Sequence, residues 1–361
     1  MFYIILAVVN QYGMKAMNAA HTRPLPRKSL RIVITSALAI LPLIAMNDAQ
    51  ACAACVETLS KDWGNQGVST HPGFTADLSY NYINQSQQRI GTGTASSTQI
   101  NALNKAGQEI EDYTTTRTTT TSLNYSSDTW GVSVQLPFVQ RTHGTYNATG
   151  AYPAKTDYLS SSDNSIGDAR VIGRYTGFSE DKTAGVIAGI KLPTGSTNAN
   201  FRDDKTPLDR SLQIGTGSTD LILGGFLTGT VAEYGWFAQG TVQHAVATKS
   251  IAGADYQPGD AYALNTGIRH AKFGSQFTPM LQLNYIHRQP DSGAGATPPD
   301  ALTGGPVTGG TLVYLAPGAS LRIGGGMSAY GFIQLPVYQN VNSLQLAARY
   351  TLTLGIKQSF E

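Results

Sequence analysis

The stretch Arg349–Glu361, with the sequence RYTLTLGIKQSFE, decides the fold class. Side chains of an extended strand alternate between two faces, so every second residue shares one environment. One face of this stretch is apolar and carries an aromatic residue at the penultimate position of the chain, whereas the other face is polar or charged. The apolar face consists of Tyr350, Leu352, Leu354, Ile356 and Phe360, and the polar face of Arg349, Thr351, Thr353 and Lys357. This pattern predicts a strand with lipid on one side and water on the other.

The same alternation recurs along the chain and predicts about twelve strands. Their expected ranges are 74–85, 113–125, 130–140, 168–178, 184–192, 219–228, 234–246, 260–270, 276–287, 311–323, 329–338 and 346–360. The facing of the Thr-rich range 113–125 stays open. After residue 51 the chain lacks the roughly eighteen consecutive apolar residues of a helical membrane span. Because backbone polar groups must be paired in lipid, we expect an all-β fold, a closed antiparallel transmembrane barrel of outer-membrane type.

The connections between these strands alternate in length, as in outer-membrane barrels with long outer loops and short periplasmic turns. Long polar connections are expected at 86–112, 141–167, 193–218, 247–259 and 288–310. Short ones are expected at 126–129, 179–183, 229–233, 271–275 and 324–328, and one short outer connection at 339–343. An even strand count places both ends of the barrel in the periplasm. There the last strand, ending at Phe360, is expected to be recognised by the outer-membrane assembly machinery.

The first 51 residues have the features of a secretory leader. Arg23, Arg27, Lys28 and Arg31 precede an apolar run from residue 32 to 46, and a small-x-small pattern at 49–51 follows. A second apolar patch at residues 2–9 lies before this basic region, which suggests that translation begins at Met14 or Met17. We therefore expect a signal peptide at 1–51, a short periplasmic segment at 52–73 and the transmembrane barrel at 74–361. This organisation predicts export to the outer membrane of a Gram-negative bacterium.

The charge balance argues against nucleic acid as a partner. Removing the leader's five basic residues and one acidic residue from the totals of 25 and 23 leaves a net charge of −2. Phosphate binding needs a clustered basic surface, and the sequence does not contain one. Only 13% of all residues are charged, against the quarter that is typical of soluble domains. A wall that faces lipid accounts for this deficit, so membrane lipid is the expected surroundings.

Cys52 and Cys55 form a C-x-x-C pair directly after the expected cleavage site. An oxidising periplasm favours a local disulfide between them. Lipidation of Cys52 and a redox or metal role remain alternatives. No His follows Cys55 as in haem attachment, and a zinc site would need further ligands that nothing nearby clearly supplies. We expect neither a bound metal nor a cofactor.

Strand facing sends a set of polar side chains into the barrel. The pore-lining candidates are Asp77, Asp168, Arg170, Arg174, Lys191, Asp220, Arg269, Gln334, Arg349 and Lys357, and the same facing applies to Arg322. The basic members outnumber the acidic ones, so a water-filled lumen would favour anions such as organic carboxylates. The alternative is that these charges pair with one another across a filled interior, as in small barrels. Loops 86–112 and 193–218 are the best candidates for a constriction.

Several phrases resemble the outer-membrane family named after the meta-pathway of phenol degradation. They are GDAR at 167–170 with GRY at 173–175, GIKLPTG at 189–195, GSTDL at 217–221, LAPG at 315–318 and QLPVYQ at 334–339. The resemblance covers most of the range 74–360. It implies an outer-membrane channel, in some cases connected with aromatic-compound catabolism, and it does not fix the solute.

The residues and the resemblance together favour a channel for passive diffusion of small polar or amphipathic solutes, including organic or aromatic anions. A surface hydrolase of phospholipase type is one alternative, because His244 and His287 fall near outer strand ends on the lipid-facing side. A recognisable nucleophile motif such as G-x-S-x-G is absent from the sequence, so we do not expect an enzyme. A structural barrel with a blocked lumen is the other alternative.

Overall fold

The computed structural model describes residues 72–360, apart from 179, 204, 252 and 271–275. The expected leader at 1–51, and Cys52 and Cys55 in the segment 52–73, lie outside the described residues. The described part is a single antiparallel sheet with one short α-helix, α3 (Ser97–Lys105). Among the described residues, no helix has the length and apolar character that a bilayer crossing requires.

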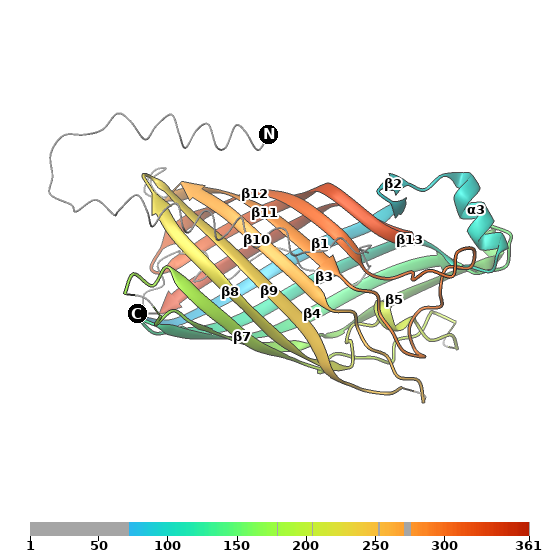
Figure 1. Ribbon diagram of the computed structural model, residues 1–361, viewed down its shortest axis with the longest axis horizontal. Helices are drawn as coiled ribbons and strands as arrows, with labels where there is room; N and C mark the ends of the chain where they lie inside the picture. Colours follow the sequence, from blue (N-terminus) through green and yellow to red (C-terminus); the bar gives the residue numbers. More distant parts are fainter. Residues whose placement is uncertain (1–71, 179, 204, 252, 271–275, 361) are drawn as a thin grey trace. The chain divides into compact units, whose positions relative to one another are not determined.

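Neighbouring strands of the sheet are antiparallel, and most of them also follow one another along the chain (Figure 1). They are β1 (Gly73–Gly91), β2 (Gly93–Thr94), β3 (Ile110–Ser126), β4 (Trp130–Tyr146), β5 (Tyr158–Ile166), β6 (Ala169–Tyr175), β7 (Ala184–Leu192), β8 (Ser218–Val231), β9 (Tyr234–Thr248), β10 (Ala261–His270), β11 (Phe277–Arg288), β12 (Gly310–Gly324) and β13 (Met327–Phe360). Two short 3₁₀ helices lie in the connections, Lys155–Asp157 and Arg210–Leu212.

The sheet closes on itself because β13 pairs with β12 on one side and with β1 on the other. In the described residues this ring contains eleven of the labelled strands, with β2 and β5 outside the main path. The first half of β13 lies antiparallel to β12, and the second half lies antiparallel to β1. The strand therefore reverses direction near Ser343, whose φ is 37°. If the two halves of β13 are counted separately, the described ring contains twelve strands, as the alternation predicts.

The outer surface of the barrel is apolar, as expected for contact with lipid. On β4, five alternate side chains from Trp130 to Phe138 are each between 37 and 47% exposed. The face between them turns inward, where Ser133 is only 7% exposed. Exposed Tyr350, Leu354, Ile356 and Phe360 confirm the outward face of the closing strand. An exterior of this kind is stable in hydrocarbon, whereas in water it would be a large unpaired hydrophobic surface.

The Thr-rich strand β3 supplies part of the polar interior. Thr116, Thr118, Thr120 and Ser122 are all buried, between 1 and 8% exposed, so this alternate set faces the lumen. Leu123, on the opposite face, is 60% exposed. The structure thus settles the facing of a strand whose hydroxyl-rich sequence gives no apolar signal.

Aromatic side chains gather where strands meet the short turns. Tyr125 lies between Phe74 and Trp130, with ring centroids 4.9 and 5.2 Å away. Tyr175 and Phe178 form a similar pair at 5.0 Å. Rings at this level are typical of a membrane interface, where one edge contacts lipid and the other contacts water.

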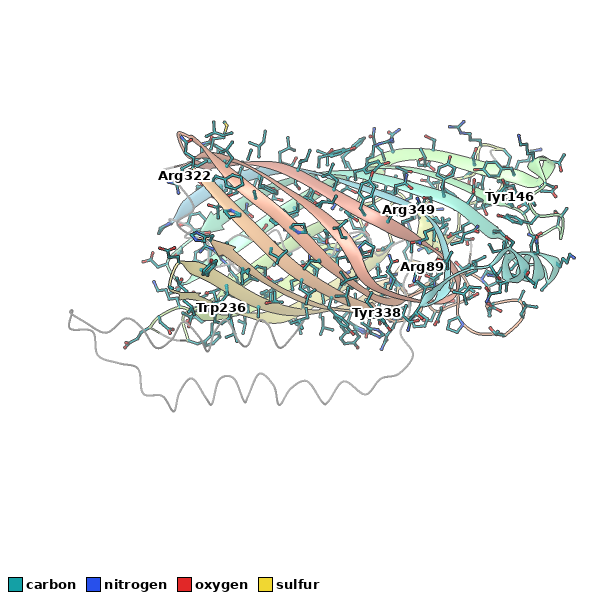
Figure 2. The ribbon with its side chains drawn as sticks, turned by 90° about the horizontal axis from the view of Figure 1, so that it is seen from above. Arg89, Tyr146, Trp236, Arg322, Tyr338 and Arg349 are labelled. Atoms are coloured by element: carbon teal, nitrogen blue, oxygen red, sulfur yellow. The ribbon has the colours of Figure 1, made fainter. Side chains whose placement is uncertain are left out.

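The wall formed by β1, β3, β4 and β5 is longer than the sequence pattern predicts. The expected loops at 86–112 and 141–167 are strand over much of their length, and they contain β2, β5 and α3 as well. Figure 1 shows these strands reaching toward the end that carries α3, beyond β8, β9 and β10. In Figure 2, Tyr146 marks that end, and Arg322 and Trp236 lie toward the opposite one.

The helix α3 closes part of this extension. Ser96 and Gln99 form a capping box at its N-terminus, and Ile100 and Leu103 are buried against Ile110 and Leu344. A capping box satisfies two helical N–H groups that would otherwise lack acceptors. The helix is therefore fixed to the outer rim between β1, β3 and β13.

Candidate functional site

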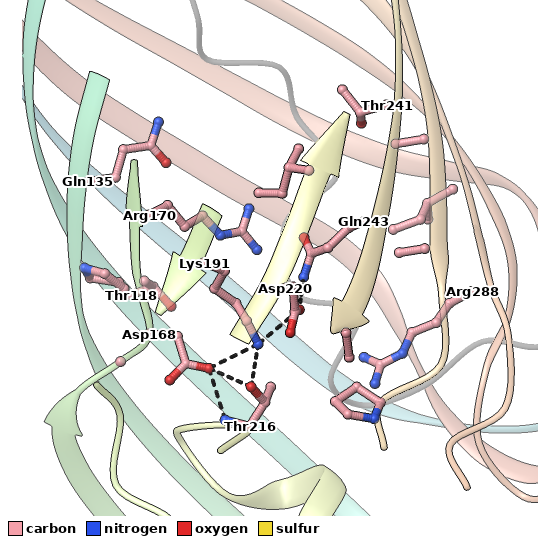
Figure 3. Close-up of a pocket in the computed structure, with 18 of the residues that line it drawn as sticks. Thr118, Gln135, Asp168, Arg170, Lys191, Thr216, Asp220, Thr241, Gln243 and Arg288 are labelled. Atoms are coloured by element: carbon pink, nitrogen blue, oxygen red, sulfur yellow. Dashed lines mark hydrogen bonds and ion pairs between the residues drawn. The ribbon is translucent and has the colours of Figure 1, made fainter. Parts of the chain in front are cut away.

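The lumen contains a cavity of about 350 Å³ on the side formed by β3 to β11. Its wall combines charged and polar side chains with a series of aliphatic ones from β6, β7, β8 and β11 (Figure 3). Two connecting segments also contribute, residues 210–216 before β8 and 256–259 before β10. A mixed lining of this size is typical of a site for a small molecule.

Buried side chains occupy part of the interior on the β11–β13 side. Met280, Ala316, Tyr330 and Phe332 form one buried cluster between β11, β12 and β13. A second cluster consists of Ile286, Leu312, Tyr314 and Val341, and Ile286 also lines the cavity. These side chains narrow the interior on that side.

Lys191 is the centre of the cavity's charge network. Its Nζ lies 2.9 Å from Asp220 Oδ2 and 3.3 Å from Asp168 Oδ2, and all three side chains are at least nine-tenths buried. The same ammonium donates to Ser218 Oγ at 3.0 Å and to Thr216 Oγ1. Three strands, β6 to β8, and the segment before β8 are thereby joined at one point (Figure 3).

The two carboxylates have further donors. Asp168 accepts hydrogen bonds from the backbone N–H groups of Gly195 at 3.0 Å and Thr216 at 2.9 Å. Asp220 accepts from Ser218 Oγ at 2.6 Å and from Gln243 Nε2 at 2.5 Å. Because every member is hydrogen-bonded, this buried network is a fixed structural element with a net charge of −1.

The connection between β7 and β8 folds into the lumen. Arg141 Nη1 donates to the carbonyl oxygens of Leu212 at 2.8 Å and Gln213 at 3.0 Å. The ends of the connection approach so closely that a Cβ at Gly215 would lie 2.3 Å from the carbonyl oxygen of Gly195. Only glycine fits that approach, so the sequence at this point permits the inward fold.

A small core of its own supports this connection. Ala199, Phe201, Leu208 and Leu212 are buried together against Leu159 of β5. The amide of the buried Gln213 bonds to Ala199 and Leu208 across the loop. The segment therefore has a defined conformation where it lines the cavity.

The remaining cations of the lining differ in their partners. Arg288 Nη2 lies 2.7 Å from Asp291 Oδ1, which neutralises it. Arg210 lies over the ring of Tyr256 at 5.0 Å and donates to Thr216 O at 3.0 Å. Arg170 points into the cavity from β6 (Figure 3). Within the described chain, neither Arg170 nor Arg210 forms an ion pair with a carboxylate.

Four of the ten pore-lining candidates meet in this cavity, namely Asp168, Arg170, Lys191 and Asp220. The other six lie elsewhere on the sheet. Asp77, opposite Lys357 in the register, accepts from Tyr330 Oη at 3.0 Å, and Gln334 accepts from Asn284 at 3.3 Å.

The other three candidates are arginines. Arg174 donates to Ser126 Oγ at 2.8 Å, and Arg269 lies against Gly235. Arg349 is exposed next to a register irregularity, where Ile83 pairs with Thr351 but Gln85 pairs with Ala348. Arg322, which has the same expected facing, is exposed near the end of β12.

Sequence reasoning missed Arg141, Arg210, Tyr256 and Arg288, since all four fall in ranges expected to be loops. For two of them a signal existed. The outward series on β4 ends at Phe138, so continued alternation places residues 139 and 141 inside. The same continuation from Leu281 and Leu283 places residue 288 inside. Arg210 and Tyr256 lie in true connections, where alternation carries no information.

His244 and His287 do not form a common dyad. They lie on β9 and β11, which are separated by β10. His244 Nδ1 is 2.7 Å from Asp260 Oδ1, and His287 Nδ1 is 3.2 Å from Thr311 Oγ1. The arrangement gives no specific support to the hydrolase alternative.

No family model and no curated protein matches the sequence. Among solved structures, an outer membrane channel from Pseudomonas putida F1 matches with a TM-score of 0.56 at 11% identity, over 84% of this chain and 100% of that chain. A monoaromatic hydrocarbon channel, CymD, matches with a TM-score of 0.43 at 10% identity, over 88% and 99% of the two chains. The toluene transporter TodX of P. putida has a TM-score of 0.43 at 9% identity, over 81% and 91%. The first likeness confirms the fold of an outer-membrane β-barrel.

Proposed function

We propose that this outer-membrane barrel is a channel through which small polar or amphipathic solutes diffuse passively. The observation that supports this function best is the luminal cavity, a space of about 350 Å³ lined by charged side chains inside an apolar wall. Water and polar solutes are stable in such a lumen, whereas the exterior is stable only in lipid. The likeness to an outer membrane channel, and the sequence resemblance to the phenol-degradation family, support the same proposal.

The charges of the lining favour anions. Five cations line the cavity, Arg141, Arg170, Lys191, Arg210 and Arg288, against the two carboxylates of Asp168 and Asp220. Including Asp291, which pairs with Arg288, the balance remains positive. Fixed charge in a narrow tube with low-dielectric walls concentrates counter-ions, so organic anions are the expected solutes.

A barrel with a blocked lumen is the second candidate, and a specific observation favours it. The clusters around Tyr330 and Tyr314 occupy part of the interior on the β11–β13 side, and the segment before β8 lines the cavity. If these side chains leave no continuous path, the protein would be structural.

Conductance in planar bilayers separates the two candidates. A channel is expected to give discrete current steps and, under a KCl gradient, a reversal potential on the anion side. Arg170→Ala removes a charge that lines the cavity and is expected to shift that potential toward neutrality. Lys182→Ala removes an equal charge from the exposed connection between β6 and β7 and serves as the matched control. A purified, folded barrel without current steps would support the structural candidate.

We also infer that the outer-membrane assembly machinery recognises the closing strand through its C-terminal aromatic residue. Phe360 is 54% exposed at the end of β13, where it pairs with Phe74 of the first strand. Phe360→Ala is expected to lower the amount of assembled barrel in cells but not the stability of the barrel refolded in vitro. An unchanged cellular yield would contradict this inference.

A further inference from the structure

Two guanidinium groups of the cavity lack a counter-charge from the protein. Lys191 is balanced by Asp168 and Asp220, and Arg288 by Asp291. Arg170 and Arg210 have no such carboxylate among the described residues. The cavity therefore carries positive charge at Arg170 and Arg210 that no carboxylate of the described chain pairs with. A further cation of the lining is Arg141, whose guanidinium donates to the carbonyl oxygens of Leu212 and Gln213.

The guanidinium of Arg210 is held in place, but not all of its N–H donors have hydrogen-bond acceptors. One nitrogen, Nη2, donates to Thr216 O, and the guanidinium lies 5.0 Å from the centre of the Tyr256 ring. Its Nε and Nη1 are buried and have no hydrogen-bond partner within the described chain. Leaving buried donors of a charged group unpaired costs more than a typical hydrogen bond contributes. These donors fit an acceptor that enters the cavity.

The orientation of Arg210 is fixed from both sides. Tyr256 donates its hydroxyl to Asp291 Oδ2 at 2.8 Å, so the ring that supports the guanidinium is itself anchored. On the other side, a Cβ at Gly217, whose φ is +69°, would lie 2.9 Å from Arg210 Nη2. A guanidinium fixed in this way can donate to a carboxylate, because Nε–H or Nη1–H forms a parallel pair with the second N–H of Nη2, whose first N–H bonds to Thr216 O.

The rest of the lining is suited to an apolar body. Ile172, Ile187, Ile214 and Ile222 contribute aliphatic surface to the same cavity. A volume of about 350 Å³ is near the lower end of the range for small-molecule sites. The cavity thus combines cations without a carboxylate with aliphatic surface and with neutral polar side chains.

We propose that the cavity is a binding site for small monocarboxylates with a single aromatic or alicyclic ring, whose carboxylate bonds to Arg210 and is attracted by Arg170. The ring packs on the aliphatic lining, where Ile172 and Ile214 are partly exposed. This inference rests on the proposed function and deepens it, because a solute that binds inside the lumen moves through a saturable step.

The direct test is equilibrium binding of benzoate to the purified protein in detergent, measured by calorimetry. Arg210→Gln and Arg170→Gln are each expected to weaken binding, the first by at least about tenfold, since a charge-assisted hydrogen bond is lost. Arg210→Lys keeps the charge without the fork and is expected to give an intermediate affinity. Arg322→Gln, which removes an exposed cation near the end of β12, is the matched control and is expected to bind as the parent does.

Benzyl alcohol, which has the ring without the charge, is the matched control ligand. Heat-dependent mobility on gels shows whether each variant retains the folded barrel. If Arg210→Gln does not fold, Arg170→Gln and Arg210→Lys still decide the question. Equal benzoate affinity in these variants and the parent, equal affinity for benzyl alcohol, or no binding at millimolar benzoate would overturn the proposal.

Conductance measured in parallel separates this proposal from the proposed function. In the parent channel, benzoate is expected to reduce the chloride current, and Arg210→Gln is expected to need about tenfold more benzoate for the same reduction. A protein that binds benzoate through these arginines but carries no current would support the proposed binding site and contradict the proposed channel function. A protein that conducts without binding benzoate would retain the channel and lose the site.

Discussion

Replacing Lys191 by Met is expected to destabilise the barrel strongly, because it leaves two buried carboxylates without their cation. Met has nearly the same length and fills the space of the lysine stem. The change removes the contacts to Asp220 at 2.9 Å and Asp168 at 3.3 Å, together with the hydrogen bond to Ser218 at 3.0 Å. All three charged side chains are at least nine-tenths buried, so solvent does little to screen the two carboxylates that remain.

The magnitude follows from the partners that are left. Asp168 keeps donors from Gly195 and Thr216, and Asp220 keeps those of Ser218 and Gln243, so neither carboxylate is fully orphaned. Removing one partner of a buried ion pair typically costs about 3–5 kcal/mol, and we expect Lys191→Met to fall in that range. Further replacing both aspartates by Asn removes the uncompensated charge, and we expect the triple variant to recover most of the loss.

Urea unfolding in phospholipid vesicles, followed by tryptophan fluorescence, measures this free energy. Trp130 and Trp236 lie on β4 and β9 and report on two sides of the barrel. A loss below about 1 kcal/mol for Lys191→Met would show that the network contributes no more than a surface ion pair. Failure of the triple variant to recover stability would refute the assignment of the loss to the carboxylates.

Three further predictions test the exterior, the outer rim and the inward segment. Leu223→Arg, on the lipid-facing surface of β8, is expected to lower the free energy of urea unfolding by about 2–4 kcal/mol. The control Leu302→Arg, in an exposed connection, is expected to change this free energy by less than about 0.5 kcal/mol. Equal effects of the two substitutions would contradict the lipid-facing position of Leu223. Burial, and then the carboxylate of Asp209, raises the pKa of Glu109 from 4.5 to about 7, so the folded state loses stability as pH rises from 4.5 through 7. Glu109→Gln is therefore expected to raise the melting temperature above pH 7 and leave it unchanged below pH 4.5; the reverse order would refute this sign. Arg141→Gln releases two carbonyl groups of the segment before β8 and is expected to increase single-channel conductance; an unchanged conductance would exclude this segment from the constriction.

The strands that cross the lipid are readable from sequence because the two environments differ so much. On β4 each outward position from Trp130 to Phe138 must be apolar, and each inward one can be polar, which imposes a period of two. The range 184–192 of β7 is recovered without error for the same reason. The facing of β3 could not be predicted, since threonine is tolerated on either surface.

The extension of the wall beyond the membrane is not readable in this way. β5 shows no alternation of apolar and polar residues, and its sequence YLSSSDNSI has the composition of a loop; its Leu159 packs on the small core of the β7–β8 connection. Strand there is selected by pairing with β4, whose residues from Phe138 to Tyr146 lie opposite it. Pairing with a distant partner is tertiary information, which local composition does not contain.

The residues of the candidate site also differ in whether the sequence predicts their positions. Facing alone places Asp168, Lys191 and Asp220 inside the barrel, because all three lie on or next to spanning strands. The register then brings Lys191 opposite Asp220 and beside the start of β6, so strand pairing accounts for the charge network. Neither strand facing nor register predicts the position of Arg210, since that position depends on how the 25 residues between β7 and β8 fold.

That dependence explains how Arg210, one of the two arginines without a carboxylate, comes to lie in a connection, whereas the other, Arg170, lies on β6. A cation on a strand is opposite fixed neighbours, and in this barrel Lys191 and Arg288 have carboxylates nearby while Arg170 has none among the described residues. Arg210 is instead carried inward by a segment whose fold is secured elsewhere, at the Gly195–Gly215 approach and the Arg141 contacts. Because those contacts stabilise the segment, the cation at its tip needs no partner from the protein and stays available to a ligand.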